Sequence, residues 1–145
     1  MISDNGFVLL HPELLEFTPE ELLSQIIFRA KIYAQDASKQ LVNDAVITVP
    51  PFFGQPERNS VIKAAKLAGI KVLQLINSNT ALALNYGVFR RKDFNSTPTN
   101  ILFYDQGAAS TIATIASYQI VKSKERGFVE TIPELRIKGL LIVCY

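Results

Sequence analysis

The middle of this chain carries alternating strand and helix signals that restrict its possible folds more than any other feature. Ala45–Val49 is a short apolar run rich in β-branched residues that stops at Pro50, and it is predicted to be a strand buried on both faces. Pro56 opens a helix that Gly69, in a left-handed conformation, is predicted to close. A second buried strand is predicted at Lys71–Ile76. Two strands joined by one helix form a βαβ unit with parallel strands, so the predicted fold class is α/β.

A longer helix is predicted before this unit. Thr18 can accept a hydrogen bond from the N–H of Glu21, whose carboxylate can reach back, and Pro19 suits the first helical position. The helix is predicted to run to about Lys39. Apolar residues at three- and four-residue spacing give it a predicted core-facing side, made of Leu22, Leu23, Ile26, Ile27, Ala30, Tyr33, Ala34 and Ala37.

The second half of the chain begins with a short predicted helix and then becomes rich in strand signals. The helix is expected at Thr80–Tyr86 and is expected to end at Gly87, and Arg90–Thr99 is a polar linker or surface loop. Strands are predicted at Ile101–Tyr104 and Thr111–Val121. Because only a short loop separates these strands, we expect an antiparallel hairpin.

Composition limits the class of protein. With 145 residues, of which 48% are hydrophobic, the chain has the usual size of one domain and enough apolar side chains for a packed core. A net charge of +2 is too small to argue for nucleic acid or an anionic membrane, so neither is an expected partner, and the basic cluster of Arg90, Arg91 and Lys92 is expected to be a solvated loop. The single cysteine, Cys144, cannot form an internal disulfide.

Neither end of the sequence predicts export or membrane insertion. The first residues include Asp4 and lack both a basic region and a long apolar run, so they do not resemble a secretory signal. The apolar stretch Gly139–Tyr145 is too short to span a bilayer. His11 is expected to be a loop residue rather than a metal ligand, because the sequence has no second histidine. Asn95 begins a glycosylation sequon on the polar loop.

The loop of the predicted hairpin is the candidate for chemistry. The segment from Asp105 to Thr111 has the sequence D-Q-G-A-A-S-T. A phosphate is held by backbone N–H groups that converge on it, which requires small residues where the chain approaches closely. The loop therefore suggests a phosphate site. The alternative for such a short motif is an ordinary hairpin with a glycine turn.

Several segments together are similar to one protein family. The ATPase domain of the 70-kDa heat-shock protein family is matched in order and spacing by V-I-T-V-P-P-F-F at 46–53, V-L-Q-L-I-N at 72–77 and N-Y-G-V-F-R-R-K-D-F-N at 85–95. The sequences of these segments most resemble the large endoplasmic-reticulum branch of the family, the glucose-regulated or hypoxia up-regulated chaperones. The resemblance covers roughly residues 17 to 139.

The resemblance implies a partial actin-like ATPase domain, with the end of lobe I and the first hairpin of lobe II. The implied divisions are an N-terminal segment at 1–16, a partial lobe I at 17–92, the start of lobe II at 93–139 and a divergent tail at 140–145. The family's catalytic lysine region, most of lobe II and its peptide-binding domain have no counterpart in the sequence.

The resemblance also implies roles for residues of the loop. The family commonly has D-L-G-G-G-T here, so Asp105 corresponds to the carboxylate near the magnesium water shell and Ser110 to the threonine that faces phosphate. Gly107 matches the first glycine of that motif. Ala108 and Ala109 replace the next two glycines, which would cost on the order of a kcal/mol at any position that needs a positive φ.

Two further positions predict weak hydrolysis. Ser78 stands where the family has a glutamate that helps place the water around magnesium, and Ile112 stands where it has an aspartate. Catalysis of phosphoryl transfer needs fixed charges around the reacting phosphate. Pro50 and Arg58 correspond to residues that relay nucleotide state toward the interdomain linker. The alternative for Arg58 is a solvent-facing arginine in the first turn of a helix.

The implied function is that of a fragment of an ATP-binding molecular chaperone in the lumen of the endoplasmic reticulum. Its expected cofactors are ATP or ADP with Mg²⁺, bound weakly or not at all by this chain, with no protein side chain binding the metal directly and no catalytic residue. Its expected partners are unfolded protein clients and a conventional 70-kDa chaperone. Two alternatives stay open at this point: an interaction module that binds no nucleotide, and a lobe of an actin-fold small-molecule kinase.

Overall fold

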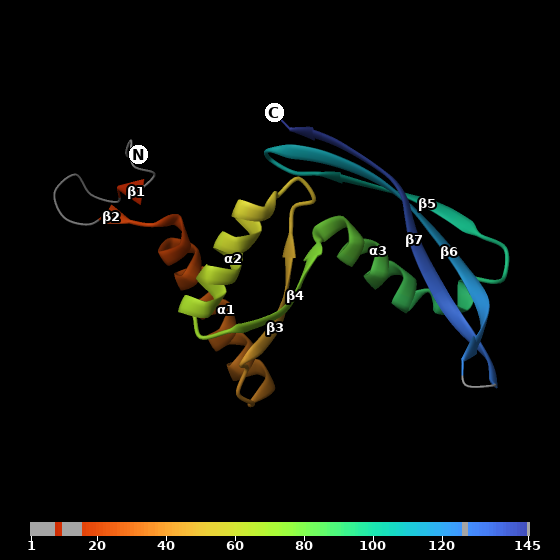
Figure 1. Ribbon diagram of the computed structural model, residues 1–145, viewed down its shortest axis with the longest axis horizontal. Helices are drawn as coiled ribbons and strands as arrows, with labels where there is room; N and C mark the ends of the chain where they lie inside the picture. Colours follow the sequence, from red (N-terminus) through yellow and green to blue (C-terminus); the bar gives the residue numbers. More distant parts are fainter. Residues whose placement is uncertain (1–7, 10–15, 126–127, 145) are drawn as a thin grey trace. The chain divides into compact units, whose positions relative to one another are not determined.

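The structure, a computed structural model, describes residues 8–9, 16–125 and 128–144 and separates into two compact units. The first unit comprises the chain up to Val49 together with Phe53–Ile76, and the second comprises Asn77 onward together with Pro50–Phe52. Both units contain helices and strands (Figure 1), which confirms the mixed α/β class. Among the described residues, no helix is both long and apolar enough to cross a membrane.

The described part of the first unit contains two helices and two small sheets. In chain order its elements are β1 (Val8–Leu9), β2 (Glu16–Phe17), α1 (Pro19–Ser38), β3 (Asp44–Val49), α2 (Gln55–Leu67) and β4 (Lys71–Asn77). β1 pairs with β2 in antiparallel orientation, and β3 pairs with β4 in a separate sheet.

The predicted start of α1 is confirmed. Thr18 is the N-cap residue and Pro19 takes the first helical position. The Thr18 N–H donates to Glu21 Oε2 at 2.8 Å, and the Glu21 N–H donates to Thr18 Oγ1 at 3.3 Å. The Glu21 N–H also donates to the Thr18 carbonyl at 3.1 Å, so the reciprocal bonds add a side-chain acceptor for Glu21 and give the Thr18 N–H its partner.

The end of α2 is also as predicted. Gly69 has a φ of 70°, in the left-handed region. The Gly69 N–H donates to the Lys66 carbonyl at 3.0 Å and the Ile70 N–H donates to the Ala65 carbonyl at 2.9 Å. This is the Schellman arrangement, in which the residue after the helix needs a conformation that glycine adopts without steric cost.

β3 and β4 form the predicted parallel pair. The N–H of Lys71, the first residue of β4, donates at 2.8 Å to the carbonyl of Asn43, which directly precedes β3. The two strands therefore begin side by side, and their arrows point the same way in Figure 1. Together with α2 they make the predicted βαβ unit.

The prediction that both strands are buried on both faces is wrong. Val49 is 1% exposed, but Val46 in β3 is 53% exposed and Leu73 in β4 is 61% exposed. The unit's two helices lie on one side of the strand pair (Figure 1). Because side chains alternate between the two faces of a strand, the residues that point away from the helices stay open to solvent.

The predicted core-facing side of α1 is largely exposed. Ile26 and Tyr33 are 67% and 62% exposed, whereas the one buried residue of α1 is Ser24. Polar groups fix α1 to its neighbours instead: Glu20 Oε1 accepts a hydrogen bond from Ser60 at 2.9 Å, and Lys31 Nζ donates to the Gly69 carbonyl at 2.8 Å. The apolar spacing identified a helix, but it did not identify the side on which α2 packs.

The second unit consists of α3 (Ser78–Phe89), the short 3₁₀ helix η1 (Arg91–Asp93) and three long strands. The strands are β5 (Thr99–Gln106), β6 (Ser110–Glu125) and β7 (Phe128–Cys144). β6 is the central strand and is antiparallel to both neighbours. Figure 1 shows α3 running beside this sheet.

The predicted hairpin is confirmed as β5 and β6, but strand β7 was not predicted. Residues 140–144, which the sequence suggested were a divergent tail, belong to β7 and pair with the start of β6, from Leu140 opposite Thr114 to Cys144 opposite Ser110. A β-bulge interrupts the pairing at Ile115 and Ala116. The pairing joins residues about thirty positions apart in the sequence, so local patterns could not reveal it.

Tyr118 of β6 is the centre of the second unit's core. It is 3% exposed, its hydroxyl donates to the Ala83 carbonyl of α3 at 2.7 Å, and its ring stacks on Phe94 with centroids 4.6 Å apart. Gly87 lies inside α3 and does not end it, contrary to the prediction. A Cβ added at Gly87 would lie 2.7 Å from Cε1 of Tyr118, so this glycine serves close packing rather than a helix end.

Thr18→Ala is expected to lower the free energy of unfolding by about 1 kcal/mol, because it removes the side-chain oxygen that caps the helix at the Glu21 N–H. Thr18→Ser keeps that oxygen and should unfold close to the unsubstituted chain. Urea denaturation of the three proteins measures the difference. An unchanged midpoint for Thr18→Ala would contradict a stabilising role for the capping box.

Gly87→Ala is expected to destabilise the second unit by roughly 1 kcal/mol or more, because overpacking against Tyr118 outweighs the gain in helix propensity. Gly139→Ala is the matched control, since no atom lies within 4 Å of the Cβ that it adds. Thermal melts compare the two. Combining Gly87→Ala with Tyr118→Leu should cost less than the sum of the separate effects, and strict additivity would contradict the steric explanation.

Candidate functional site

The candidate phosphate loop is a tight connection between β5 and β6. β5 continues through Gln106, so Asp105 lies within the strand and pairs directly with Ile112 of β6. Only Gly107, Ala108 and Ala109 lie between the strands. The Gly107 N–H donates to the Ser110 carbonyl at 2.8 Å and closes the loop.

The two alanines of this loop carry no backbone strain. Among the described residues, Lys39 and Gly69 have a positive φ, and none of the loop residues does. Ala108 and Ala109 are exposed, and within the described part of the chain their N–H groups donate no hydrogen bond. The loop therefore offers two free amide donors, and alanine fits its conformation without the penalty that a left-handed glycine position would impose.

The positions to which the resemblance assigns acidic groups supply little negative charge for a hydrated metal ion. Asp105 is exposed at the end of β5, and the residue opposite it, Ile112, is 6% exposed and apolar. Ser78 is the first residue of α3, and the next residue, Asn79, donates from Nδ2 to Thr114 Oγ1 at 3.3 Å. The described residues contain no group of three or more histidine, cysteine or acidic side chains that could hold a metal, and His11 lies outside them.

Arg58 is anchored at the start of α2. Its side chain is partly buried, and Nε donates to the Phe53 carbonyl at 2.9 Å. The guanidinium is thus fixed to the turn before the helix and is not simply extended into solvent. A role for Arg58 and Pro50 in a relay stays a prediction.

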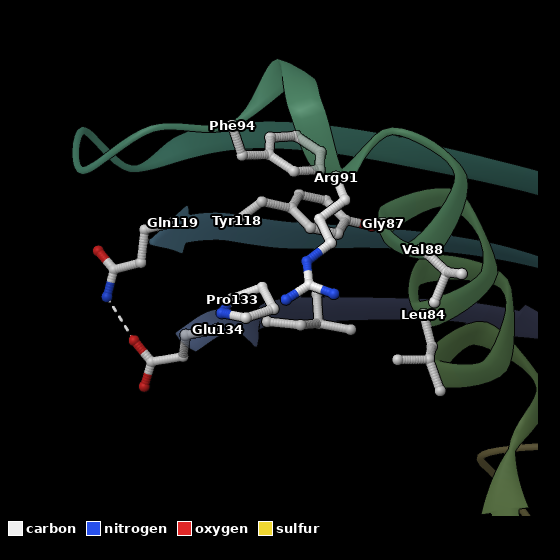
Figure 2. A pocket seen from close by; sticks show the side chains of 10 residues that line it. Leu84, Gly87, Val88, Arg91, Phe94, Tyr118, Gln119, Pro133 and Glu134 are labelled. Atoms are coloured by element: carbon white, nitrogen blue, oxygen red, sulfur yellow. Dashed lines mark hydrogen bonds between the residues drawn. The ribbon is translucent and has the colours of Figure 1, made fainter. Parts of the chain in front are cut away.

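Sequence analysis missed a small apolar pocket in the second unit, drawn in Figure 2. Its volume is about 200 Å³ and it lies between α3, η1 and the β6–β7 pair. The lining residues are Leu84, Gly87, Val88, Arg91, Phe94, Tyr118, Gln119, Pro133, Glu134 and Leu135. A glycine in the middle of an apolar helix was the one sequence signal for such a close approach.

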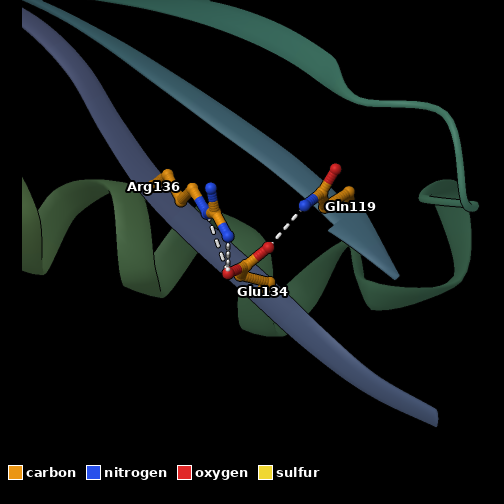
Figure 3. Close-up of polar contacts among 3 residues, drawn as sticks. All are labelled: Gln119, Glu134 and Arg136. Carbon is orange, nitrogen blue, oxygen red and sulfur yellow. Dashed lines mark hydrogen bonds and ion pairs between the residues drawn. The ribbon is translucent and has the colours of Figure 1, made fainter. Parts of the chain in front are cut away.

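A charged network lies at one side of this pocket, shown in Figure 3. Gln119 Nε2 donates to Glu134 Oε2, and Arg136 Nε donates to Glu134 Oε1 at 2.8 Å. The hydrogen bond from Arg136 and then the one from Gln119 hold the pKa of Glu134 below its usual value. The Glu134 charge is therefore already compensated by its neighbours.

The chain is thus an α/β protein whose β5–β6 hairpin carries a loop of one glycine and two alanines. Comparison with known proteins identifies its family. The family model described as "Hsp70 protein" matches residues 3–121, more than half of the chain, and the chain therefore belongs to the Hsp70 family.

The chain is also similar to named members of that family. Hypoxia up-regulated protein 1 is 59% identical in Danio rerio over 128 residues, 55% identical in Homo sapiens over 126 and 55% identical in Xenopus laevis over 126. These alignments cover 88%, 87% and 87% of this chain, but 13%, 12% and 19% of the relatives. The family resemblance found in the sequence is thus confirmed. The chain spans only a small part of the length of the curated relatives it matches.

We expect one tyrosine of the chain to ionise unusually late in alkali. Burial, and to a smaller extent nearby Tyr86, raises the pKa of Tyr118 from 10.0 to about 12. Above pH 10 Tyr118 loses its proton in the unfolded state before it does so in the folded state. The protonated phenol's contribution to the free energy of unfolding is therefore complete below pH 10 and is lost as the pH rises through about 12. An absorbance titration of tyrosinate follows the late step.

Tyr118→Phe should abolish the late ionisation step and lower stability at neutral pH by about 1 kcal/mol, because the hydrogen bond to Ala83 is lost. Tyr104→Phe is the control, since Tyr104 is 64% exposed. If all tyrosines ionised together near pH 10 in the folded chain, the burial of Tyr118 would be contradicted.

Proposed function

We propose that this chain is part of an ATP-binding molecular chaperone that assists protein folding in the endoplasmic reticulum, and that its β5–β6 loop is a weakened phosphate loop. The observation that supports this most strongly is the 55% to 59% identity to hypoxia up-regulated proteins over a segment that includes the loop. Membership of the Hsp70 family does not favour the alternative of a small-molecule kinase.

The loop residues fit a phosphate in shape. Ala108 and Ala109 present free amide N–H groups at an exposed, unstrained turn, and Ser110 adds a hydroxyl at the start of β6. Backbone donors of this kind bind anions through fixed partial charges. Gly107 would act differently, because its N–H already bonds to the Ser110 carbonyl and so shapes the loop.

The same residues fit a magnesium ion less well. Asp105 supplies one exposed carboxylate, which would reach the metal through water, while Ser78 and Ile112 supply none. Bound Mg²⁺ would neutralise charge on the phosphates, and this chain's own part would be limited to positioning them through the loop. We therefore expect weak nucleotide binding and no turnover by the isolated chain.

The finer architecture and the partners belong to the same proposal. Residues 17–92 would form part of lobe I of an actin-like ATPase domain and residues 93–139 the start of lobe II. Pro50 and the anchored Arg58 would relay nucleotide state, and unfolded clients and a conventional 70-kDa chaperone would be the partners of the longer protein. The support for these points is the family match, together with the hydrogen bond that fixes Arg58 to Phe53.

Titration of the chain with ATP and ADP in the presence of Mg²⁺ tests the proposal. We expect millimolar or weaker dissociation constants, because a few amide donors must replace the hydration shell of a polyanion. Changing both Ala108 and Ala109 to glycine should tighten binding by less than tenfold, since it removes two methyl groups but releases no backbone strain. Ser78→Glu alone should have little effect on affinity.

Two outcomes would contradict parts of this proposal. Micromolar binding by the unchanged chain would show that the loop is not weakened, and phosphate release that Asp105→Ala abolishes would show that the chain is catalytic. Absence of binding by both the unchanged chain and the double glycine variant would favour an interaction module that binds no nucleotide.

A further inference from the structure

The pocket of the second unit has the size of one amino-acid side chain. Its volume of about 200 Å³ is somewhat larger than an engineered cavity of about 150 Å³ that binds benzene. Sites for drug-sized ligands or cofactors begin at roughly 300 Å³. A phenyl or branched aliphatic group therefore fits this pocket, whereas a nucleotide does not.

The walls of the pocket are apolar, and part of them is open to solvent. Val88 and Leu84 stand one turn apart on α3 and are 63% and 51% exposed, and Phe94 and Leu135 are partly buried behind them. The floor exists because Gly87 has no side chain, which leaves the ring of Tyr118 in close contact with α3. An inserted side chain would bury these exposed surfaces, which is favourable at about 25 cal/mol per Å².

The charge at the opening is positive and uncompensated. Within the described part of the chain the side chain of Arg91 makes no hydrogen bond or ion pair, and Figure 2 shows it reaching over the lining residues. Its neighbour Arg90 differs, because it pairs with Asp93 at 3.7 Å and lies over the ring of Tyr86. The acidic group on the other side, Glu134, is neutralised by Arg136 at 2.7 Å.

From this combination we infer that the pocket is a docking site for an acidic segment of a partner protein that inserts one aromatic side chain, with a neighbouring carboxylate bound by Arg91. The apolar walls select the ring, and the free guanidinium selects the acid in a bidentate, charge-assisted arrangement. Of the basic cluster at residues 90–92, the inference gives a specific use to Arg91 alone, because Arg90 is paired with Asp93 and Lys92 does not line the pocket. This inference does not depend on nucleotide binding.

Fluorescence anisotropy with labelled peptides tests the docking site on the complete chain. The probe is the pentapeptide Gly-Asp-Phe-Asp-Gly, compared with Gly-Lys-Phe-Lys-Gly and with Gly-Asp-Gly-Asp-Gly. We expect the first to bind roughly tenfold or more tightly than either of the others, because only it supplies both the ring and the carboxylates. Equal binding of the basic peptide, or of the peptide without phenylalanine, would overturn the inference.

Two pairs of variants locate the binding. Arg91→Ala should weaken binding of the acidic aromatic peptide roughly tenfold. Its control, Lys92→Ala, removes the same charge from the adjacent residue, which does not line the pocket. Val88→Ser should also weaken binding, whereas Phe89→Ser, which removes an 81% exposed ring outside the pocket, should not. Equal losses within either pair would show unspecific attraction and overturn the inference.

Amide chemical shifts of the unsubstituted chain give a measurement that does not depend on the variants folding. Titration with Gly-Asp-Phe-Asp-Gly should shift the amide resonances of α3, of η1 and of Glu134 and Leu135 in β7. Shifts confined to the β5–β6 loop, or no shifts at all, would contradict the proposed site.

Discussion

The packing of Tyr118 against α3 decides the form of the second unit. A tyrosine in the central strand can be buried there only because its hydroxyl reaches the Ala83 carbonyl and because Gly87 leaves room for the ring. A buried phenol without a hydrogen-bond partner would be costly, so the two contacts depend on each other. The same contact creates the pocket, since the ring forms the floor on which Phe94 stacks.

Each unit covers only one face of its main sheet. In the second unit, the face with Ile112, Thr114 and Ala116 is buried, while the other face exposes Leu102, Tyr104, Ile115, Leu141 and Val143. Register places Tyr104 and Leu141 on either side of Ala113. Sheets of α/β proteins are usually covered by helices on both faces.

The structure of the β5–β6 loop distinguishes its backbone conformation from the charge around it, which the sequence alone could not do. Alanine in place of glycine would carry a cost only at a position that needs a positive φ, and Ala108 and Ala109 have no positive φ and keep free N–H groups. Apart from Asp105, the positions that the resemblance implies supply no carboxylate, because Ile112 is buried and apolar and Ser78 begins a helix with no acidic residue in its first turn. The proposed role as a weakened phosphate loop therefore depends on its amide groups and not on the fixed charges that phosphoryl transfer needs.

The sequence by itself determined the local elements whose signals are complete within a few residues. The capping box at Thr18, the left-handed Gly69, the parallel βαβ unit and the family were all readable, because each depends on neighbouring residues or on a long exact pattern. Only the tertiary structure decided which faces are buried, that β7 extends to Cys144, and that Gly87 serves packing. Those properties depend on residues distant in sequence that meet in space, where close packing and the pairing of backbone groups select one partner among many.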